Sequence, residues 1–322
     1  MSRLILTNVA AWRHLRLRPR VLVDVGRVTA ASTMLGAPVS MPVAIAPMAV
    51  HGLAHADGEV ASARAAEAAG VPFTLSTMSS RSIEDIAAAA PGGTRWFQLY
   101  TQAEPGQSQE LVERAAAAGF SAIILTVDLP RLAYRDRDRR SGIRMPALGN
   151  FPDRGPSHRP IDKGEPLAHA TLTWADLAEI RSWSNLPIVL KGILTAEDAR
   201  LAVEHGVDAI VVSNHGARQL DRVGAAVDAL PAIAEAVAGR TELWVDGGVR
   251  RGIDVVTALA LGARGVLVGR PILWALAAGG EAGVARALEI LREETETAMA
   301  LLGTPSTDAV TPAHVEPVPS SM

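Results

Sequence analysis

Residues 204–221 read EHGVDAIVVSNHGARQLD and contain, in order, a helix end, a buried strand and a polar turn. Gly206 follows a helical stretch and is typical of a helix C-terminal cap. The apolar run 209–212 has no polar face, which favours a strand covered on both sides. His215 and Arg218 follow at once, so a potential base and a fixed cation stand at the end of a buried strand.

The same passage from helix end to strand recurs as AAGVPF (68–73), AAGFSAI (117–123) and ALGARGV (260–266). Strands are expected at residues 43–46, 72–76, 96–100, 122–128, 188–191, 209–214, 243–246 and 265–269. Alanine-rich helices are expected between them, for example at residues 58–69, 82–89, 109–118, 196–205, 229–238 and 252–261. Eight such units predict an α/β fold, a (β/α)8 TIM barrel. A doubly wound sheet is the alternative, but no Gly-x-Gly-x-x-Gly follows the first strand.

Length and composition predict a single domain over residues 1–322, with a lead-in segment at 1–40 and a tail at 304–322. Residues are 48% hydrophobic, which allows a large core, and the net charge of −3 gives no signal for nucleic acid. Segment 129–170, rich in Arg, Pro, Gly and Asp, predicts a long loop over the active site after the fourth strand.

Other classes of protein and site are disfavoured by the sequence. There is no cysteine, so disulfides, thiolate metal sites and cysteine nucleophiles are excluded. No apolar run reaches membrane-spanning length, so we expect no membrane association and a cytoplasmic location. His51 and His55 have a helical spacing but no matching carboxylates, so no metal is expected.

The carboxyl ends of barrel strands converge on one site, and here nearly all of them carry polar groups. Glycines and arginines end the last two strands, which predicts a phosphate site; the alternative is that the glycines only allow tight turns. Lys191 ends an apolar strand and is expected to hold an anion or to act as a Schiff-base amine, unless it is structural. Asp128 and His215 follow different strands, and a carboxylate near an imidazole stabilises its protonated form.

Five stretches carry a family resemblance: WFQLY (96–100), LTVDLPRL (125–132), LKGILTAEDARLA (190–202), SNHGARQLD (213–221) and DGGVRRGIDVVTALALGARGVLVGRP (246–271). They resemble the FMN-dependent α-hydroxy acid oxidases and dehydrogenases, the group of glycolate oxidase, lactate oxidase and mandelate dehydrogenase. The resemblance extends over roughly residues 16–303.

The resemblance implies an FMN cofactor and assigns residues to each part of it. Gly247, Gly248, Arg250, Gly269 and Arg270 would hold the phosphate, with Asp246 on the ribityl chain. The isoalloxazine ring would rest on Pro47, Met48 and Ala49, and Ser76, Gln98 and Thr126 would bind its polar edge. Lys191 would stabilise the anionic reduced flavin, and Ser213 would also approach the ring.

On the substrate side, the resemblance implies that His215 is the base and that Asp128 pairs with it. Arg218 would clamp the substrate carboxylate, Tyr100 would hydrogen-bond the substrate, and Arg135 matches a second arginine near the carboxylate in some members. The reaction would oxidise a 2-hydroxy acid to a 2-oxo acid, by hydride transfer or through a carbanion.

The electron acceptor and the assembly are further expectations. Reoxidation by O2 would make the protein an oxidase, and the polar, basic loop favours this over a dehydrogenase with a quinone or protein acceptor. The alternatives are oxidation of an amine or peptide-derived substrate and a non-catalytic flavin-binding protein. The family implies a homo-oligomer, a tetramer.

Two departures from the family concern the substrate pocket. No tyrosine precedes Tyr100, whereas the family supplies a carboxylate-binding tyrosine from a longer N-terminal segment. Met78 stands where many members have a tryptophan, which predicts a reshaped and roomier pocket. We therefore expect a larger 2-hydroxy acid, such as a mandelate-type compound.

Overall fold

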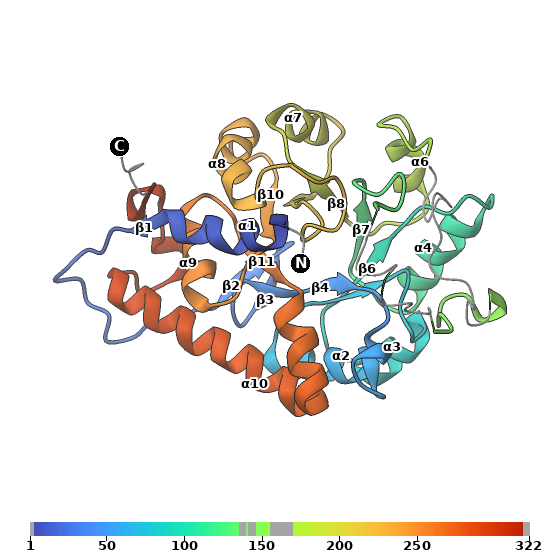
Figure 1. The fold of residues 1–322 in the computed structure, drawn as a ribbon, viewed down its shortest axis with the longest axis horizontal. Coiled ribbons are helices and arrows are strands. Elements are labelled where there is room, and N and C mark those ends of the chain that lie inside the picture. The colour runs from blue at the N-terminus through green and yellow to red at the C-terminus, as the bar shows by residue number, and fades with distance from the viewer. Residues whose placement is uncertain (1–2, 135–139, 141–145, 155–169, 318–322) are drawn as a thin grey trace.

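The computed structural model describes residues 3–134, 140, 146–154 and 170–317, and its centre is a closed barrel of parallel strands (Figure 1). The strands follow one another around the barrel in chain order, and the last strand, β11, closes it by pairing with the first, β4. They are β4 (Val43–Met48), β5 (Phe73–Ser76), β6 (Arg95–Leu99), β7 (Ala122–Thr126), β8 (Ile188–Ile193), β9 (Ala209–Val212), β10 (Glu242–Asp246) and β11 (Gly265–Val268). The predicted (β/α)8 barrel is confirmed.

Helices alternate with these strands and cover the outside of the barrel (Figure 1). The six expected helices are α2 (Gly58–Ala69), α3 (Ile83–Ala89), α4 (Gln107–Ala117), α7 (Ala196–Glu204), α8 (Ala226–Val237) and α9 (Gly252–Ala260). Among the described residues, three further helices lie outside the ranges named from the sequence: α1 (Arg3–Ala11), α6 (Asp176–Ser182) and α10 (Arg270–Leu302), whose course is broken at Gly279 and Gly280. No helix in the described part of the chain is both long and apolar enough to cross a membrane.

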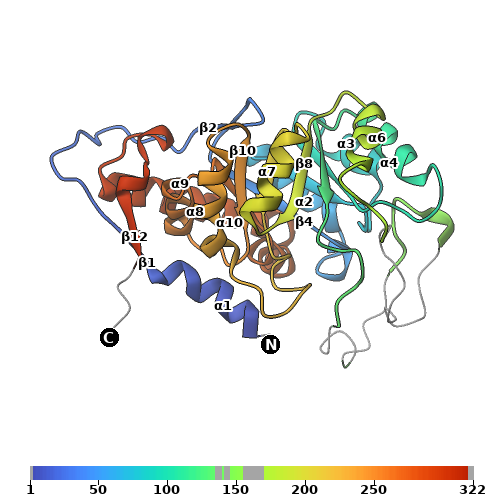
Figure 2. The ribbon, with the colours of Figure 1, turned by 90° about the horizontal axis from the view of Figure 1, so that it is seen from above.

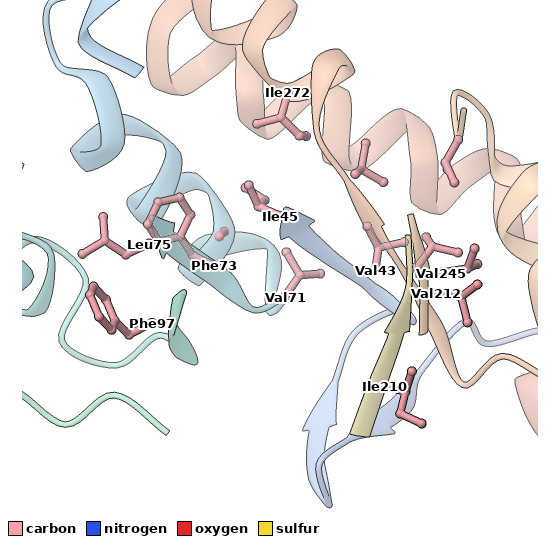
Figure 3. Packing of buried hydrophobic residues seen from close by; sticks show 14 of the residues in the cluster. Val43, Ile45, Val71, Phe73, Leu75, Phe97, Ile210, Val212, Val245 and Ile272 are labelled. Carbon is pink, nitrogen blue, oxygen red and sulfur yellow. The ribbon is translucent and has the colours of Figure 1, made fainter. Parts of the chain in front are cut away.

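Alternation along the strands separates two sets of buried side chains. One set, with Val43, Ile45, Phe73 and Leu75, packs against the surrounding helices, as the sticks in Figure 3 show. The other set fills the barrel interior, where the rings of Trp96 and Trp244 stack with centroids 4.7 Å apart. Side chains alternate between the two faces of a strand, so a residue two positions beyond an interior residue also points into the barrel. The inward positions at the carboxyl ends of the strands therefore lie directly above the interior set.

Outside the barrel, the described residues form two small antiparallel sheets. The hairpin of β2 (Ser32–Met34) and β3 (Ala37–Val39) packs its Met34 and Val39 onto the interior set. Strand β1 (Leu15–Leu17) pairs antiparallel with β12 (Val315–Pro317). The short 3-10 helices are Trp12–His14, His51–Leu53, Pro152–Arg154, Thr307–Ala309 and Pro312–His314.

The N-terminal helix α1 lies across one open end of the barrel, beside α8, and stands apart from the outer ring of helices in Figure 2. The Trp12 indole that follows it donates a hydrogen bond of 3.0 Å to the Gly247 carbonyl, just after β10. The carboxyl ends of β9 and β10 are therefore covered by the first residues of the chain.

Candidate active site

A cavity of about 480 Å³ opens at the carboxyl ends of the barrel strands. It is lined by many of the residues expected from the sequence: Pro47, Met48, Ala49, Ser76, Met78, Tyr100, Thr126, Lys191, His215, Arg218, Asp246, Gly247, Gly248, Arg250, Gly269 and Arg270. Gln98, Asp128 and Ser213 lie behind this lining and hydrogen-bond to Ser76, His215 and Lys191, respectively. The remaining candidate, Arg135, lies outside the described residues.

The polar residues in the lining and directly behind it continue the inward face of the strands. Each of five such residues follows, two positions later, a member of the interior set: Trp96 precedes Gln98, Ile124 precedes Thr126, Val189 precedes Lys191, Val211 precedes Ser213 and Trp244 precedes Asp246. Strand register also places Ser76 beside Gln98, and Thr126 beside Lys191. The last inward layer is thus polar where the layers below are apolar.

His215 is held between Asp128 and Tyr100. Its Nδ1 lies 2.8 Å from Asp128 Oδ1, and its Nε2 lies 3.3 Å from the Tyr100 hydroxyl. A neutral ring that donates its Nδ1 proton to the carboxylate keeps the Nε2 lone pair available toward the cavity. The predicted meeting of Asp128 and His215 is therefore present in the structure.

The charge balance around the imidazole differs from the simple pairing that the sequence indicates. Burial and the positive charge of Lys191 lower the pKa of His215, and Asp128 only partly opposes them. Burial alone would raise the pKa of Asp128, but its hydrogen bond from His215 and the charge of Lys191 outweigh burial, so this carboxyl has a lowered pKa. The pair is thus a neutral imidazole beside a carboxylate, which is a base ready to accept a proton.

Lys191 forms an ion pair with Asp246 at 3.2 Å and donates a 3.0 Å hydrogen bond to Ser213. Burial alone would lower the pKa of the lysine, but Asp246 and Asp128 outweigh it, and the net direction is upward. A permanently protonated amine is not a nucleophile. Of the roles left open by the sequence, the structure favours a fixed cation and not a Schiff-base amine.

Three arginines give the cavity a positive wall. Arg218, Arg250 and Arg270 all line it, and burial, to which the charges of the first two add, lowers the pKa of Arg270. Arg250 also lies over the Trp274 ring at 5.1 Å, and Arg270 donates a 2.8 Å hydrogen bond to the Gly216 carbonyl. Such a cluster favours anionic ligands.

The turn that carries His215 is held by two asparagines whose roles sequence reasoning missed. His215, Gly216 and Ala217 all have left-handed backbone angles, with φ of 58°, 59° and 64°. Asn214 accepts a hydrogen bond from the Ala217 N–H and exchanges two hydrogen bonds with Asn8 of α1. Asn214 lies within a quoted motif, but no signal in the sequence pointed to Asn8.

The two histidines considered for a metal lie apart from the cavity chemistry. His51 is buried, with its Nδ1 3.0 Å from the Ser62 hydroxyl, while His55 lies 3.6 Å from Asp57. Across the described ranges, no group of three or more His, Cys, Asp or Glu side chains has the arrangement of a metal site.

Comparison with known proteins places this geometry in a family. Residues 3–317 match the family described as FMN-dependent dehydrogenase. The chain belongs to this family. It is 46% identical to the L-lactate oxidase of Nostoc sp. over 92% of its length and 85% of the relative's, and 47% identical to glycolate oxidase 1 of Oryza sativa subsp. indica over 96% and 86%.

Solved structures agree with this membership. A crystal structure of mandelate oxidase matches with a TM-score of 0.88 at 44% identity, over 95% of this chain and 88% of that chain. A mandelate oxidase variant with (S)-mandelic acid matches with a TM-score of 0.86 at 45% identity, over 95% and 88%. The expected α-hydroxy acid oxidase family, flavoprotein oxidoreductase class and FMN cofactor are confirmed.

The residues of this FMN-dependent enzyme fit the cofactor. Buried polar atoms without a hydrogen-bond partner among the described residues include Gln98 Nε2, Thr126 Oγ1 and Asp246 Oδ1, all in the polar inward layer or directly behind it. Buried polar groups normally have partners, so these atoms match the polar groups of a flavin and its ribityl chain. Arg250 and Arg270 supply the positive charge that a phosphate needs.

Proposed function

We propose that the cavity binds FMN and a 2-hydroxy acid together, and that His215 removes a proton from this substrate while it is oxidised to the 2-oxo acid. The observation that carries the proposal is the arrangement of Asp128, His215 and Tyr100 beside Lys191 in one cavity. A neutral base, a paired cation and a positive wall together meet the requirements for oxidising a small anionic alcohol.

His215 accepts the proton at Nε2. The Nδ1–H is directed to Asp128 at 2.8 Å, so the nitrogen that faces Tyr100 is the one with a free lone pair. As the imidazole gains a proton, the Asp128 carboxylate stabilises the positive charge, because an ion pair replaces the hydrogen bond between a neutral imidazole and the carboxylate. The lowered pKa of His215 keeps the base unprotonated before the substrate binds.

The substrate carboxylate is held by Arg218, with Tyr100 as a hydrogen-bond donor and Arg135 as the proposed second arginine. Arg218 follows His215 by three residues and lines the same cavity as Tyr100. A planar guanidinium binds a carboxylate through two parallel hydrogen bonds, which also orients the carbon that is oxidised.

The cofactor contacts use the polar inward layer and the turns after the last two strands. Bound FMN supplies the two-electron acceptor for the reaction. Ser76, Gln98 and Thr126 would bind the ring's polar edge, and Lys191, linked to Ser213, would supply a protonated amine to it. Pro47, Met48 and Ala49 would support the ring, Asp246 would hold the ribityl chain, and Gly247, Gly248, Arg250, Gly269 and Arg270 would hold the phosphate.

For the substrate, we propose a 2-hydroxy acid with a large or aromatic side chain. Met78 is only half-buried and lines the cavity, and its unbranched side chain leaves room that an indole would occupy. Mandelate oxidase, among the similar solved structures, has been solved with (S)-mandelic acid. For the acceptor, we propose O2, in keeping with relatives named oxidases. A cytoplasmic homo-oligomer completes the proposal.

The test is a substrate screen with glycolate, lactate and mandelate, with O2 consumption and anaerobic loss of flavin absorbance as the two readouts. We expect mandelate to bleach the flavin fastest and to consume O2. Bleaching without O2 consumption would replace the oxidase by a dehydrogenase, and fast turnover of glycolate alone would refute the larger substrate.

The role of the base is tested by His215→Ala, which should abolish bleaching while the protein stays yellow. The matched control is His205→Ala, since His205 is exposed and stacks on Trp174. The control should bleach at the parent rate. A His215→Ala protein that bleaches normally would disprove the assignment.

A further inference from the structure

The asparagine pair Asn8–Asn214 connects the first helix of the chain to the turn that presents the base. The two side chains are almost fully buried, with exposed fractions of 1% and 3%, and 206 residues separate them in the sequence. Each amide donates a 2.8 Å hydrogen bond to the other, so both donors and both acceptors face a partner. A reciprocal buried pair of this kind has one geometry and resists sliding.

Asn214 passes this constraint to the backbone on both sides of the loop. Its Oδ1 accepts from the Ala217 N–H at 3.1 Å, and its Nδ2 donates to the Gly224 carbonyl at 3.1 Å. Asn8 thereby orients a side chain that connects the start of this loop, at Asn214, to Ala217 and Gly224 further along it. The same turn is held from the other side by Arg270, through the Gly216 carbonyl.

The turn needs such support because its backbone is strained. His215 and Ala217 are not glycines, yet both lie in the left-handed region at φ of 58° and 64°. Residues with a Cβ atom occupy this region only when the surroundings hold them there, and such strain is frequent at catalytic sites. Without the hydrogen bonds to Asn214, the turn would relax and carry the imidazole away from Asp128.

The approach of α1 to this end of the barrel is close. A Cβ atom at Gly248 would overlap the Asn8 carbonyl and the Trp12 indole, and one at Gly247 would lie 3.1 Å from Asn8 Nδ2. The two glycines, both with φ of 89°, therefore leave room for α1 as well as lining the cavity. The helix fits against the ends of β9 and β10 with Asn8 at the point of contact.

We infer that Asn8 is a positioning residue for the reaction: through Asn214 it holds the left-handed turn that aims His215 at the substrate. This inference rests on the proposed role of His215. The N-terminal helix then belongs to the catalytic apparatus, although no side chain of α1 is among the residues that line the cavity.

The test compares the parent with Asn8→Ala and with Asn8→Asp, each purified with bound flavin. The limiting rate of anaerobic flavin bleaching should fall at least about tenfold in Asn8→Ala, because misplacing a catalytic group by an ångström costs up to about 100-fold. Asn8→Asp keeps the acceptor for Asn214 Nδ2 but sets a carboxylate oxygen against Asn214 Oδ1, so its rate should also fall. Rates per bound flavin remain informative if part of the Asn8→Ala protein loses its fold.

Two further readouts separate positioning from a loss of structure. The substrate Kd, obtained from the dependence of the bleaching rate on substrate concentration, should change less than the limiting rate. Leu4→Ala is the matched control: Leu4 is 5% exposed on the same helix, and its apolar side chain has no hydrogen-bonding group. It should lower the melting temperature at least as much as Asn8→Ala, because it removes buried apolar contacts, and leave the bleaching rate within about twofold.

The outcomes are distinct. A parent that is not bleached by any 2-hydroxy acid refutes the proposed function. A parent that bleaches together with Asn8 variants at the parent rate refutes the positioning role alone. Equal loss of rate in Leu4→Ala and Asn8→Ala also refutes it, because general loosening of α1 would then explain the effect.

Discussion

Replacing Asp128 by asparagine should slow the reaction without weakening substrate binding. Asp128 Oδ1 lies 2.8 Å from His215 Nδ1, and both side chains are about 85% buried. Two full charges at that separation attract by about 6 kcal/mol at an effective dielectric constant of about 20. If the imidazole carries about half a charge in the transition state, about 3 kcal/mol of stabilisation is lost, which corresponds to about 100-fold in rate.

The assay is anaerobic rapid mixing of the Asp128→Asn protein with substrate, followed by flavin absorbance. The limiting rate should fall about 100-fold, while the substrate Kd changes less than about threefold, because the Arg218 contact is untouched. The control is Asp221→Asn, which removes the same charge from an exposed position of the loop after His215 and should leave both values unchanged.

The pH dependence gives an independent check with a definite sign. Activity requires neutral His215, so kcat/KM falls as the pH drops through the pKa of this imidazole. In the parent this fall should lie below the ordinary histidine value, because burial and Lys191 lower the pKa. Asp128 opposes that shift, so Asp128→Asn should move the fall to still lower pH. A fall that moves upward, or a rate within threefold of the parent, would refute the reasoning.

Three other changes have defined outcomes. Lys191→Met leaves the buried Asp246 without its cation and should destabilise the protein by about 3–5 kcal/mol in chemical unfolding, with part of the loss recovered when Asp246→Asn is added. Gly192→Ala puts a Cβ within 2.6 Å of the Asp128 side chain at a φ of 118°, so it should cost about 1–3 kcal/mol of stability and slow flavin bleaching like Asp128→Asn; an unaffected rate would contradict the close packing. Met78→Trp should lower kcat/KM for mandelate relative to glycolate by at least tenfold in parallel steady-state assays, since the larger ring occupies the space of the side chain; an unchanged ratio would place the substrate elsewhere.

Much of the site could be predicted because strand periodicity is local. Once β7 and β8 are recognised, alternation places Thr126 and Lys191 at the inward ends of their strands, and both line the cavity. The role of Lys191 could not be chosen in the same way, because it depends on the ion pair with Asp246 from another strand. No range was named for the helix α10, whose regular course is interrupted at Gly279 and Gly280.

The direction in which the pKa of His215 shifts is a second feature that the sequence predicted only in part. Its partner Asp128 was expected, and by itself it would raise the pKa of the imidazole. Burial and Lys191 reverse the direction, and both arise only when three strand ends are brought into one cavity. A pKa shift is the sum of burial, hydrogen bonds and all nearby charges, so the nearest partner alone does not decide its direction.

By itself, the sequence determined the barrel, its family and the identity of the groups at the strand ends, since apolar runs, glycine helix ends and local motifs are read within a few residues. Only the tertiary structure decided how those groups contact one another. It pairs Lys191 with Asp246, sets His215 against Asp128 in a buried site that lowers the pKa of the imidazole, and brings Asn8 into contact with Asn214, 206 positions away in the sequence. Such contacts depend on closure of the barrel and docking of α1, and no local pattern of residues encodes either distance.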